Sequence, residues 1–159
     1  MLHIKLICLG KLKEKYWREA EVEYLKRLQA FSKIEIVELK EESFGEKISP
    51  EMIRFKEAVK IKSALEKFKG AYVVVLDEHG EQFSSVEFSK KLSDLSLSGN
   101  TNFVFVIGGP LGLDESVLKM AKLKLSFSSF TFTHQMIRVF LWEQIYRSMM
   151  ISANRQYHY

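Results

Sequence analysis

Apolar residues alternate along the chain between two patterns. Short apolar runs rich in β-branched residues predict strands at residues 4–9, 34–39, 72–76, 102–107 and 123–127. Apolar residues at helical spacing predict helices over residues 13–28, 50–68, 114–121 and 134–152. A further helix is predicted to begin at residue 84. Strands that alternate with helices imply a mostly parallel sheet with helices on both faces. The predicted fold is therefore α/β, with residues 1–159 forming a single domain.

The composition is that of an ordinary folded domain. Of the 159 residues, 47% are hydrophobic, 28% are charged and only two are prolines, which excludes the disordered and collagen-like classes. The formal charge of +4 and the pI near 9.1 favour a polyanionic partner such as RNA or DNA.

The single cysteine, Cys8, excludes a disulfide framework within the chain and a metal cluster of the CxxC type. No apolar run approaches the roughly 20 residues that span a bilayer, and the N-terminus lacks a small-residue cleavage site. We therefore expect a cytoplasmic protein without a membrane segment or a metal.

Three predicted strands end in unusual segments. In open α/β sheets, ligands bind beyond the carboxyl ends of the strands, which here are Leu76, Ile107 and Phe127. The sequence GGPLG follows Ile107, and its two adjacent glycines allow the backbone to approach a ligand closely. It matches neither the GxGxxG nor the Walker A pattern, so a tight turn without a ligand stays open as an alternative.

The polar segment Asp77-Glu78-His79-Gly80 follows the strand that ends at Leu76. It brings two carboxylates and an imidazole to the same edge of the sheet, where they could serve acid–base chemistry. Nothing in the sequence fixes their geometry, and we favour the interpretation as a solvated turn.

Hydroxyl and aromatic residues are mixed in the run SFSSFTFT, residues 126–133. Apolar walls with a few hydroxyl and backbone donors suit a heterocyclic ligand such as adenine. The same spacing of Phe127, Phe130 and Phe132 fits a longer strand whose phenylalanines lie in the core. Both interpretations are open, and we favour ligand lining.

The last predicted helix is more apolar than contact with one sheet requires. The excess predicts a second partner, most simply a symmetry-related copy of the chain. Basic and aromatic groups in the helix and tail suit phosphate and base contacts, unless the arginines pair with the glutamate and the tail is frayed. The polar residues of this region are His134, Arg138, Glu143, Arg147, Arg155, Tyr157 and His158.

Several of these segments occur together in one known family. The sequences VIGGPLGL, LSFSSFTFTHQMIRVFLWEQIYR and YHY, with the N-terminal LGKLKEKYW, resemble the RlmH family of SPOUT-class methyltransferases. That family modifies pseudouridine in large-subunit ribosomal RNA, and the resemblance covers essentially the whole chain. One departure is Thr133, where many relatives have proline, so the loop is expected to be less rigid and inferences about the orientation of His134 are weaker.

The resemblance implies an α/β domain whose C-terminal part forms a trefoil knot and which acts as a homodimer. It also implies S-adenosylmethionine as the methyl donor. Carried over residue by residue, the donor site comprises the segments after three strands. These are Leu76, Gly108, Phe127, Ser128, Ser129, Phe130, Thr131 and Phe132.

The implied reaction is methyl transfer to N3 of a pseudouridine in 23S ribosomal RNA, with the assembled ribosome as the expected substrate. The acceptor nitrogen must lose a proton and lie in line with the methyl carbon. Our hypotheses are His134 or His158 as the proton acceptor and Arg138 as the electrostatic partner of the deprotonated base. Tyr157 would stack on the base or orient it, and the active site is composite if the tail reaches a neighbouring subunit.

Two rival functions fit the same residues. The first keeps methyl transfer but changes the acceptor to tRNA or a ribose 2'-hydroxyl, because the donor pocket says little about the nucleophile. The second is a non-catalytic α/β module that binds adenosine-type ligands or dimerises without chemistry.

Overall fold

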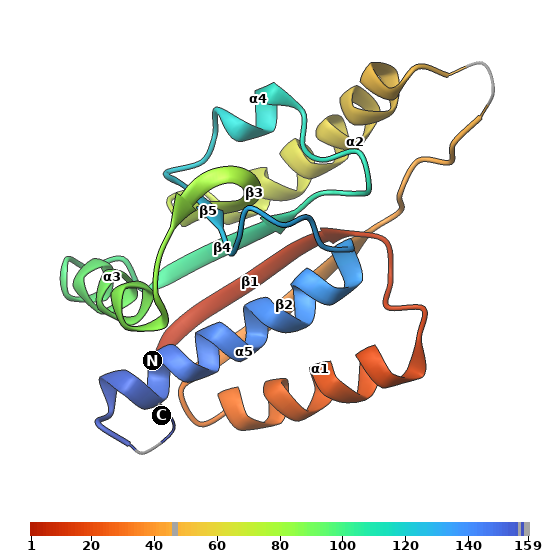
Figure 1. Ribbon diagram of the computed structural model, residues 1–159. Helices are drawn as coiled ribbons and strands as arrows, with labels where there is room; N and C mark the ends of the chain where they lie inside the picture. The colour runs from red at the N-terminus through yellow and green to blue at the C-terminus, as the bar shows by residue number, and fades with distance from the viewer. Residues whose placement is uncertain (46–47, 156, 158–159) are drawn as a thin grey trace.

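The computed structural model describes residues 1–45, 48–155 and 157, in which strands and helices alternate (Figure 1). The strands are β1 (Leu2–Leu9), β2 (Ser32–Leu39), β3 (Tyr72–Gln82), β4 (Asn102–Ile107) and β5 (Leu123–Ser126). The helices are α1 (Lys15–Leu28), α2 (Pro50–Leu65, followed by a 3-10 turn at Glu66–Phe68), α3 (Ser85–Leu97), α4 (Glu115–Leu118) and α5 (His134–Ser152).

The five strands form one parallel sheet in the order β2-β1-β4-β3-β5. The parallel α/β architecture predicted from the sequence is therefore confirmed. β4 lies between β1 and β3, so the chain returns to the middle of the sheet after β3. A ligand site is expected where the order of the strands reverses, beyond their carboxyl ends.

Each face of the sheet has its own hydrophobic core, as β4 illustrates. Phe103 and Phe105 face the core formed with α1, α3 and α5, whereas Val104 and Val106 face the core formed with α2. Val117 of α4 packs into this second core. Figure 1 shows α1 and α5 on one side of the sheet and α2 and α4 on the other, so the predicted coverage of both faces is also confirmed.

Two helix starts follow the sequence signals. The Ser49 side chain accepts a hydrogen bond from the Met52 backbone N–H at the start of α2. Ser84 and Glu87 form a complete capping box at the start of α3. No helix among residues 1–45, 48–155 and 157 combines the length and hydropathy needed to cross a membrane.

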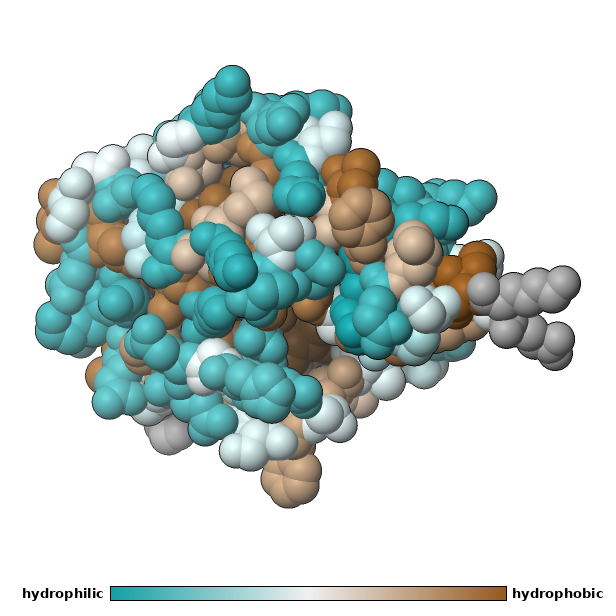
Figure 2. All heavy atoms as spheres, turned by 90° about the horizontal axis from the view of Figure 1, so that it is seen from above, coloured by the Kyte–Doolittle hydropathy of each residue, from teal (hydrophilic) through white to brown (hydrophobic). Residues whose placement is uncertain are grey.

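The surface above α2 and α4 is largely hydrophilic (Figure 2). Hydrophobic side chains gather where the chain leads from β2 into α2. The exposed large hydrophobic residues in that part of the chain are Phe44, Ile48, Met52, Phe55 and Val59.

Three elements differ from their predicted extents. β3 does not end in a turn after Leu76 but continues to Gln82, with a register shift between Leu76 and Glu81 along β5. The predicted helix over 114–121 is a single turn, α4. β5 ends at Ser126, which places the three phenylalanines of residues 127–132 in a loop and not in a longer strand. The trefoil knot stays a prediction.

Candidate active site

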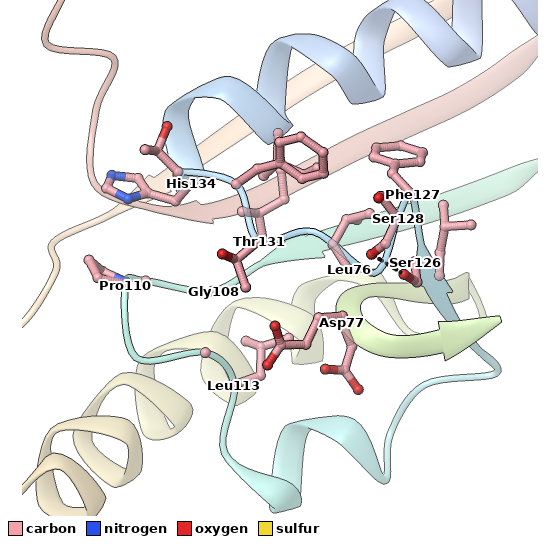
Figure 3. Close-up of a pocket in the computed structure, with 18 of the residues that line it drawn as sticks. Leu76, Asp77, Gly108, Pro110, Leu113, Ser126, Phe127, Ser128, Thr131 and His134 are labelled. Atoms are coloured by element: carbon pink, nitrogen blue, oxygen red, sulfur yellow. Dashed lines mark hydrogen bonds between the residues drawn. The ribbon is translucent and has the colours of Figure 1, made fainter. Parts of the chain in front are cut away.

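A cavity of about 810 Å³ lies beyond the carboxyl ends of the central strands (Figure 3). Three segments line it: the acidic bulge (residues 77–80) through its first two residues, the glycine turn (residues 108–113) and the serine–phenylalanine loop (residues 127–133). Leu76, Ile107 and Phe127, the predicted strand ends, all contribute to its walls. The start of α5 closes one side. The structure thus joins in one site residues as far apart in the sequence as Leu76 and Ile137.

The glycine turn is compact, and a side chain at Gly108 or Gly109 would meet neighbouring atoms. The Gly112 N–H donates to the Gly109 carbonyl at 3.0 Å. A Cβ on Gly108 would lie 3.0 Å from the Leu113 side chain and 3.1 Å from the Gly112 carbonyl carbon. The Glu57 carboxylate of α2 lies under the turn, 3.2 Å from the position of a Cβ on Gly109. Nothing in the sequence links Glu57 to this turn, so sequence reasoning missed this support.

Short-range hydrogen bonds shape the serine–phenylalanine loop. The Ser126 hydroxyl donates to the Ser128 carbonyl at 3.0 Å, and the Phe130 N–H donates to the Ser128 hydroxyl at 3.0 Å. These bonds hold the backbone in a curve around the cavity. Of the eight predicted donor-site residues, seven line the cavity and Ser129 does not. The Ser129 hydroxyl instead accepts a hydrogen bond from the Gln82 side chain at 3.3 Å.

His134, the first residue of α5, lines the cavity beside Pro110 (Figure 3). Its Nε2 is the one buried side-chain nitrogen or oxygen, within the described residues, that has no hydrogen-bond partner. Burial lowers the pKa of His134 below its ordinary value of 6.5, against the opposing charge of Glu41. An imidazole that stays neutral near pH 7 can accept a proton or a hydrogen bond from a bound molecule.

We expect the burial of His134 to make the protein less stable in mild acid. Between the lowered pKa of the folded state and 6.5, the unfolded chain binds more protons than the folded chain. The free energy of unfolding therefore falls as the pH drops through this window. His134→Gln should flatten this part of the profile in urea unfolding measured between about pH 5 and pH 8.

The matched control for that measurement is His79→Gln, because the His79 side chain is 83% exposed. The free energy of unfolding of His79→Gln should depend on pH in the same way as that of the wild type. Identical profiles for His134→Gln and the wild type would mean that His134 does not titrate in this window.

Arg138 lies one turn along α5 from His134 but outside the cavity lining. Its guanidinium makes a bidentate pair with Glu21 of α1, at 2.6 and 2.7 Å, and a third bond to Glu38 at 2.8 Å. Trp142 donates to the same Glu21 carboxylate at 2.8 Å. Burial opposes the charge of Arg138, but the hydrogen bonds and charges of its partners outweigh burial and raise its pKa. Arg138 is thus committed to the protein interior.

Cys8 of β1 completes this buried network. Arg138 Nη1 lies 3.2 Å from the Cys8 sulfur, and burial raises the pKa of the thiol to about 12. A thiol protonated to that extent is unreactive at neutral pH. Cys8 therefore contributes packing and a weak polar contact.

The tail residue Tyr157 lies at the opposite end of α5 from the cavity. Its ring packs edge-on against Tyr146 at 4.9 Å between centroids, and Arg147 lies over it at 4.9 Å. Arg147 pairs with Glu143 at 2.6 Å. Such a pair was one of the two alternatives that the sequence left open for the arginines of this region. Residues 134 and 146 are separated by about 18 Å of helix, so Tyr157 does not reach the cavity of its own chain. His158 lies outside the described residues.

α5 is covered more fully than its sequence suggested. It lies against both α1 and α3, and the Ser89 hydroxyl of α3 donates to the Ser148 carbonyl at 2.9 Å. Much of the apolar surface that predicted a second subunit is thus buried within the chain. What stays exposed near the cavity is a cluster of three aromatic residues, Phe130, Phe132 and Phe140.

Gln135 is a further cavity residue that the sequence did not single out. Its side chain accepts a hydrogen bond from the Lys13 backbone N–H at 2.7 Å, which ties the loop after β1 to the start of α5. The residues span 122 positions, so no local pattern could have revealed the contact.

Comparisons with known proteins agree with this architecture. A family described as "Predicted SPOUT methyltransferase" matches residues 2–158. The "Ribosomal RNA large subunit methyltransferase H" proteins of Clostridium acetobutylicum and Ligilactobacillus salivarius are each 48% identical to this chain. Each alignment covers 99% of both chains.

A solved structure described as a probable methylase family protein from Haemophilus influenzae has the same fold. It matches with a TM-score of 0.57 at 12% identity, over 99% of this chain and 70% of that one. The chain belongs to the SPOUT methyltransferase family, and within it to the family of the ribosomal RNA large subunit methyltransferase H proteins.

Proposed function

We propose that this protein transfers a methyl group from S-adenosylmethionine to N3 of a pseudouridine in large-subunit ribosomal RNA. One observation carries the proposal: residues 76–78 of β3 and the segments after β4 and β5 form a single cavity in a chain of a methyltransferase family. The relatives carry the name of an enzyme that acts on this RNA. Because the proposed acceptor is ribosomal RNA, we also propose that the protein acts in the cytoplasm.

The cavity residues fit the donor. A volume of about 810 Å³ lies within the range of roughly 300–1,000 Å³ that is usual for small-molecule sites. Apolar side chains such as Leu76, Leu113 and Ile137 offer a surface for an adenine ring. The hydroxyls of Ser128 and Thr131 and the backbone of the glycine turn supply polar contacts.

The chemistry places few demands on the protein. The donor supplies a methyl carbon on a positively charged sulfur, and its bond to sulfur breaks as the carbon bonds to N3 and the N3 proton leaves. His134 is our candidate to accept that proton, because it lines the cavity and burial lowers its pKa. The curved walls of the cavity contribute by holding the methyl carbon and the acceptor in line.

We further propose that the enzyme is a homodimer with a composite site. Tyr157 is too distant to act on the cavity of its own chain, so any role in orienting the base requires a second copy. The exposed cluster of Phe130, Phe132 and Phe140 beside the cavity offers apolar surface for that copy. A site shared between two copies would present a larger surface to the RNA than one copy does.

Labelled donor tests the reaction. Whole ribosomes, large subunits and naked RNA are treated with the protein, and the RNA is digested and analysed by mass spectrometry. The proposal expects one methyl group on the base of a large-subunit pseudouridine. Label on tRNA or on a ribose would support the first rival function, and adenosine-type binding without any label would support the non-catalytic module.

We expect two inactive variants to restore activity when their subunits are mixed. Gly108→Val blocks the cavity because its side chain meets Leu113, whereas Tyr157→Ala removes the tail group. After unfolding and refolding together, about a quarter of wild-type activity should return, because half of randomly formed dimers are mixed and each has one complete site. Mixing without refolding is the control. No recovery in verified mixed dimers would contradict a composite site.

A further inference from the structure

The charge of the cavity is opposite to that of the whole chain. The chain carries a formal charge of +4, yet the cavity lining contains no lysine or arginine among the described residues. Its charged side chains are Asp77 and Glu78, at the start of the acidic bulge. His134, the other titratable group in the lining, has a lowered pKa and adds no positive charge near pH 7. The charges that directly line the cavity are therefore negative.

The two carboxylates are not equivalent. Asp77 is partly buried, and Figure 3 shows its carboxylate directed toward Leu113 of the glycine turn. The Glu78 side chain is 49% exposed, and its carboxylate lies 3.5 Å from Nε2 of His79 on the outer side of the bulge. Because water screens exposed charges, Asp77 acts more strongly on a molecule in the cavity than Glu78 does.

Donor and product of the proposed reaction differ by one charge. S-adenosylmethionine carries an ammonium, a sulfonium and a carboxylate, so its net charge is +1. Loss of the methyl group converts the sulfonium into a neutral thioether, so S-adenosylhomocysteine has no net charge. Their apolar parts and hydrogen-bonding groups are otherwise the same. A negative field inside a partly closed cavity is therefore a means of telling them apart.

We propose that Asp77, assisted by Glu78, makes the cavity select the charged donor over its neutral product. This inference rests on the proposed function and adds a specificity-determining residue to it. The selection opposes product inhibition, because the attraction disappears when the sulfonium loses its charge. It also predicts a specific kinetic pattern. A carboxylate stabilises the sulfonium of the bound donor more than the partly discharged transition state, so Asp77 lowers KM without raising kcat.

Calorimetry on the full-length protein tests the proposal with both ligands. For Asp77→Asn, the Kd of S-adenosylmethionine should rise about five- to tenfold, while that of S-adenosylhomocysteine should change less than about twofold. Glu78→Gln should raise the donor Kd about twofold. Glu81→Gln is the matched control, because Glu81 lies in the same strand, exposed and outside the cavity lining, and should change neither Kd.

Salt and kinetics give independent readouts. The preference of the wild type for the donor should shrink between about 0.05 and 0.5 M KCl, and Asp77→Asn should show a smaller dependence. In methylation assays, Asp77→Asn should raise KM for the donor and leave kcat unchanged or higher. Retained binding of the product shows that the cavity of the variant is intact.

Other outcomes would overturn the proposal. Equal weakening of both ligands in Asp77→Asn would mean that Asp77 binds a group they share, such as a ribose hydroxyl. Unchanged binding of both would mean that Asp77 takes no part. If neither ligand binds to correctly folded wild-type protein, the proposed function itself fails, and this inference fails with it.

Discussion

Replacing Arg138 by methionine is expected to lower the free energy of unfolding by about 3–5 kcal/mol. Arg138 is 4% exposed, and its guanidinium is held by the carboxylates of Glu21 and Glu38. Methionine fills part of the same volume but leaves Glu21, which is 7% exposed, without its cationic partner. A charge buried without compensation is among the most destabilising changes that a folded protein can undergo.

Urea unfolding followed by circular dichroism measures this effect. Arg147→Met is the matched control on the same helix, because Arg147 pairs with Glu143 while its side chain is 25% exposed. It should cost less than about 1 kcal/mol. Removing both buried charges with Glu21→Met and Arg138→Met should be less costly than the sum of the two single changes.

The same variants separate two roles for Arg138. Our sequence-based hypothesis made it an electrostatic partner of the deprotonated base, whereas the structure gives it an internal network. If Arg138→Met kept its stability within about 1 kcal/mol but lost methyl transfer, the catalytic hypothesis would regain support. Loss of stability with donor binding intact in the folded fraction would support the network.

The second large effect is expected for Gly80→Ala. A Cβ on Gly80 would lie 2.6 Å from both the carbonyl carbon and the carbonyl oxygen of Lys124. These are backbone atoms of β5, so the strand itself must move. Gly80 belongs to the acidic bulge and β5 leads into the serine–phenylalanine loop, so two of the three cavity walls would shift together.

We expect Gly80→Ala to weaken donor binding about tenfold or more and to cost about 1–3 kcal/mol of stability through overpacking. Calorimetry and urea unfolding measure the two effects. The control is Gly45→Ala, because among the residues that the structure describes a Cβ there meets only the Ile48 side chain, at 3.8 Å. Donor affinity that survives in Gly80→Ala would show that the close approach of β3 and β5 does not set the cavity shape.

Helices and strands with a regular pattern of apolar residues were predictable from the sequence. β4 alternates Phe103 and Phe105 with Val104 and Val106, which is the signature of a strand buried on both faces. The location of the cavity was predictable as well. The rule that ligands bind at the carboxyl ends of parallel strands directed attention to the segments that line it.

What could not be predicted depends on distant partners. Arg138 looks like any polar residue on a helix, and its buried ion pairs depend on Glu21 and Glu38, which are 117 and 100 positions away. The continuation of β3 beyond Leu76 was missed because residues 77–80 have turn-like composition. Pairing of Glu81 with Leu125 overrides that local preference. In each case a contact across the fold decides the structure.

The distance between Glu21 and Arg138 also has a consequence for biosynthesis. A ribosome makes the chain from its N-terminus, so α1 emerges long before its cation exists. Until α5 follows, Glu21 keeps its charge in water, and the faces of α1 and β1 that contact α5 have nothing to cover them. We therefore expect the N-terminal half to lack a stable fold of its own during synthesis. The contact between α1 and α5 can form only when nearly the whole polypeptide has been synthesised.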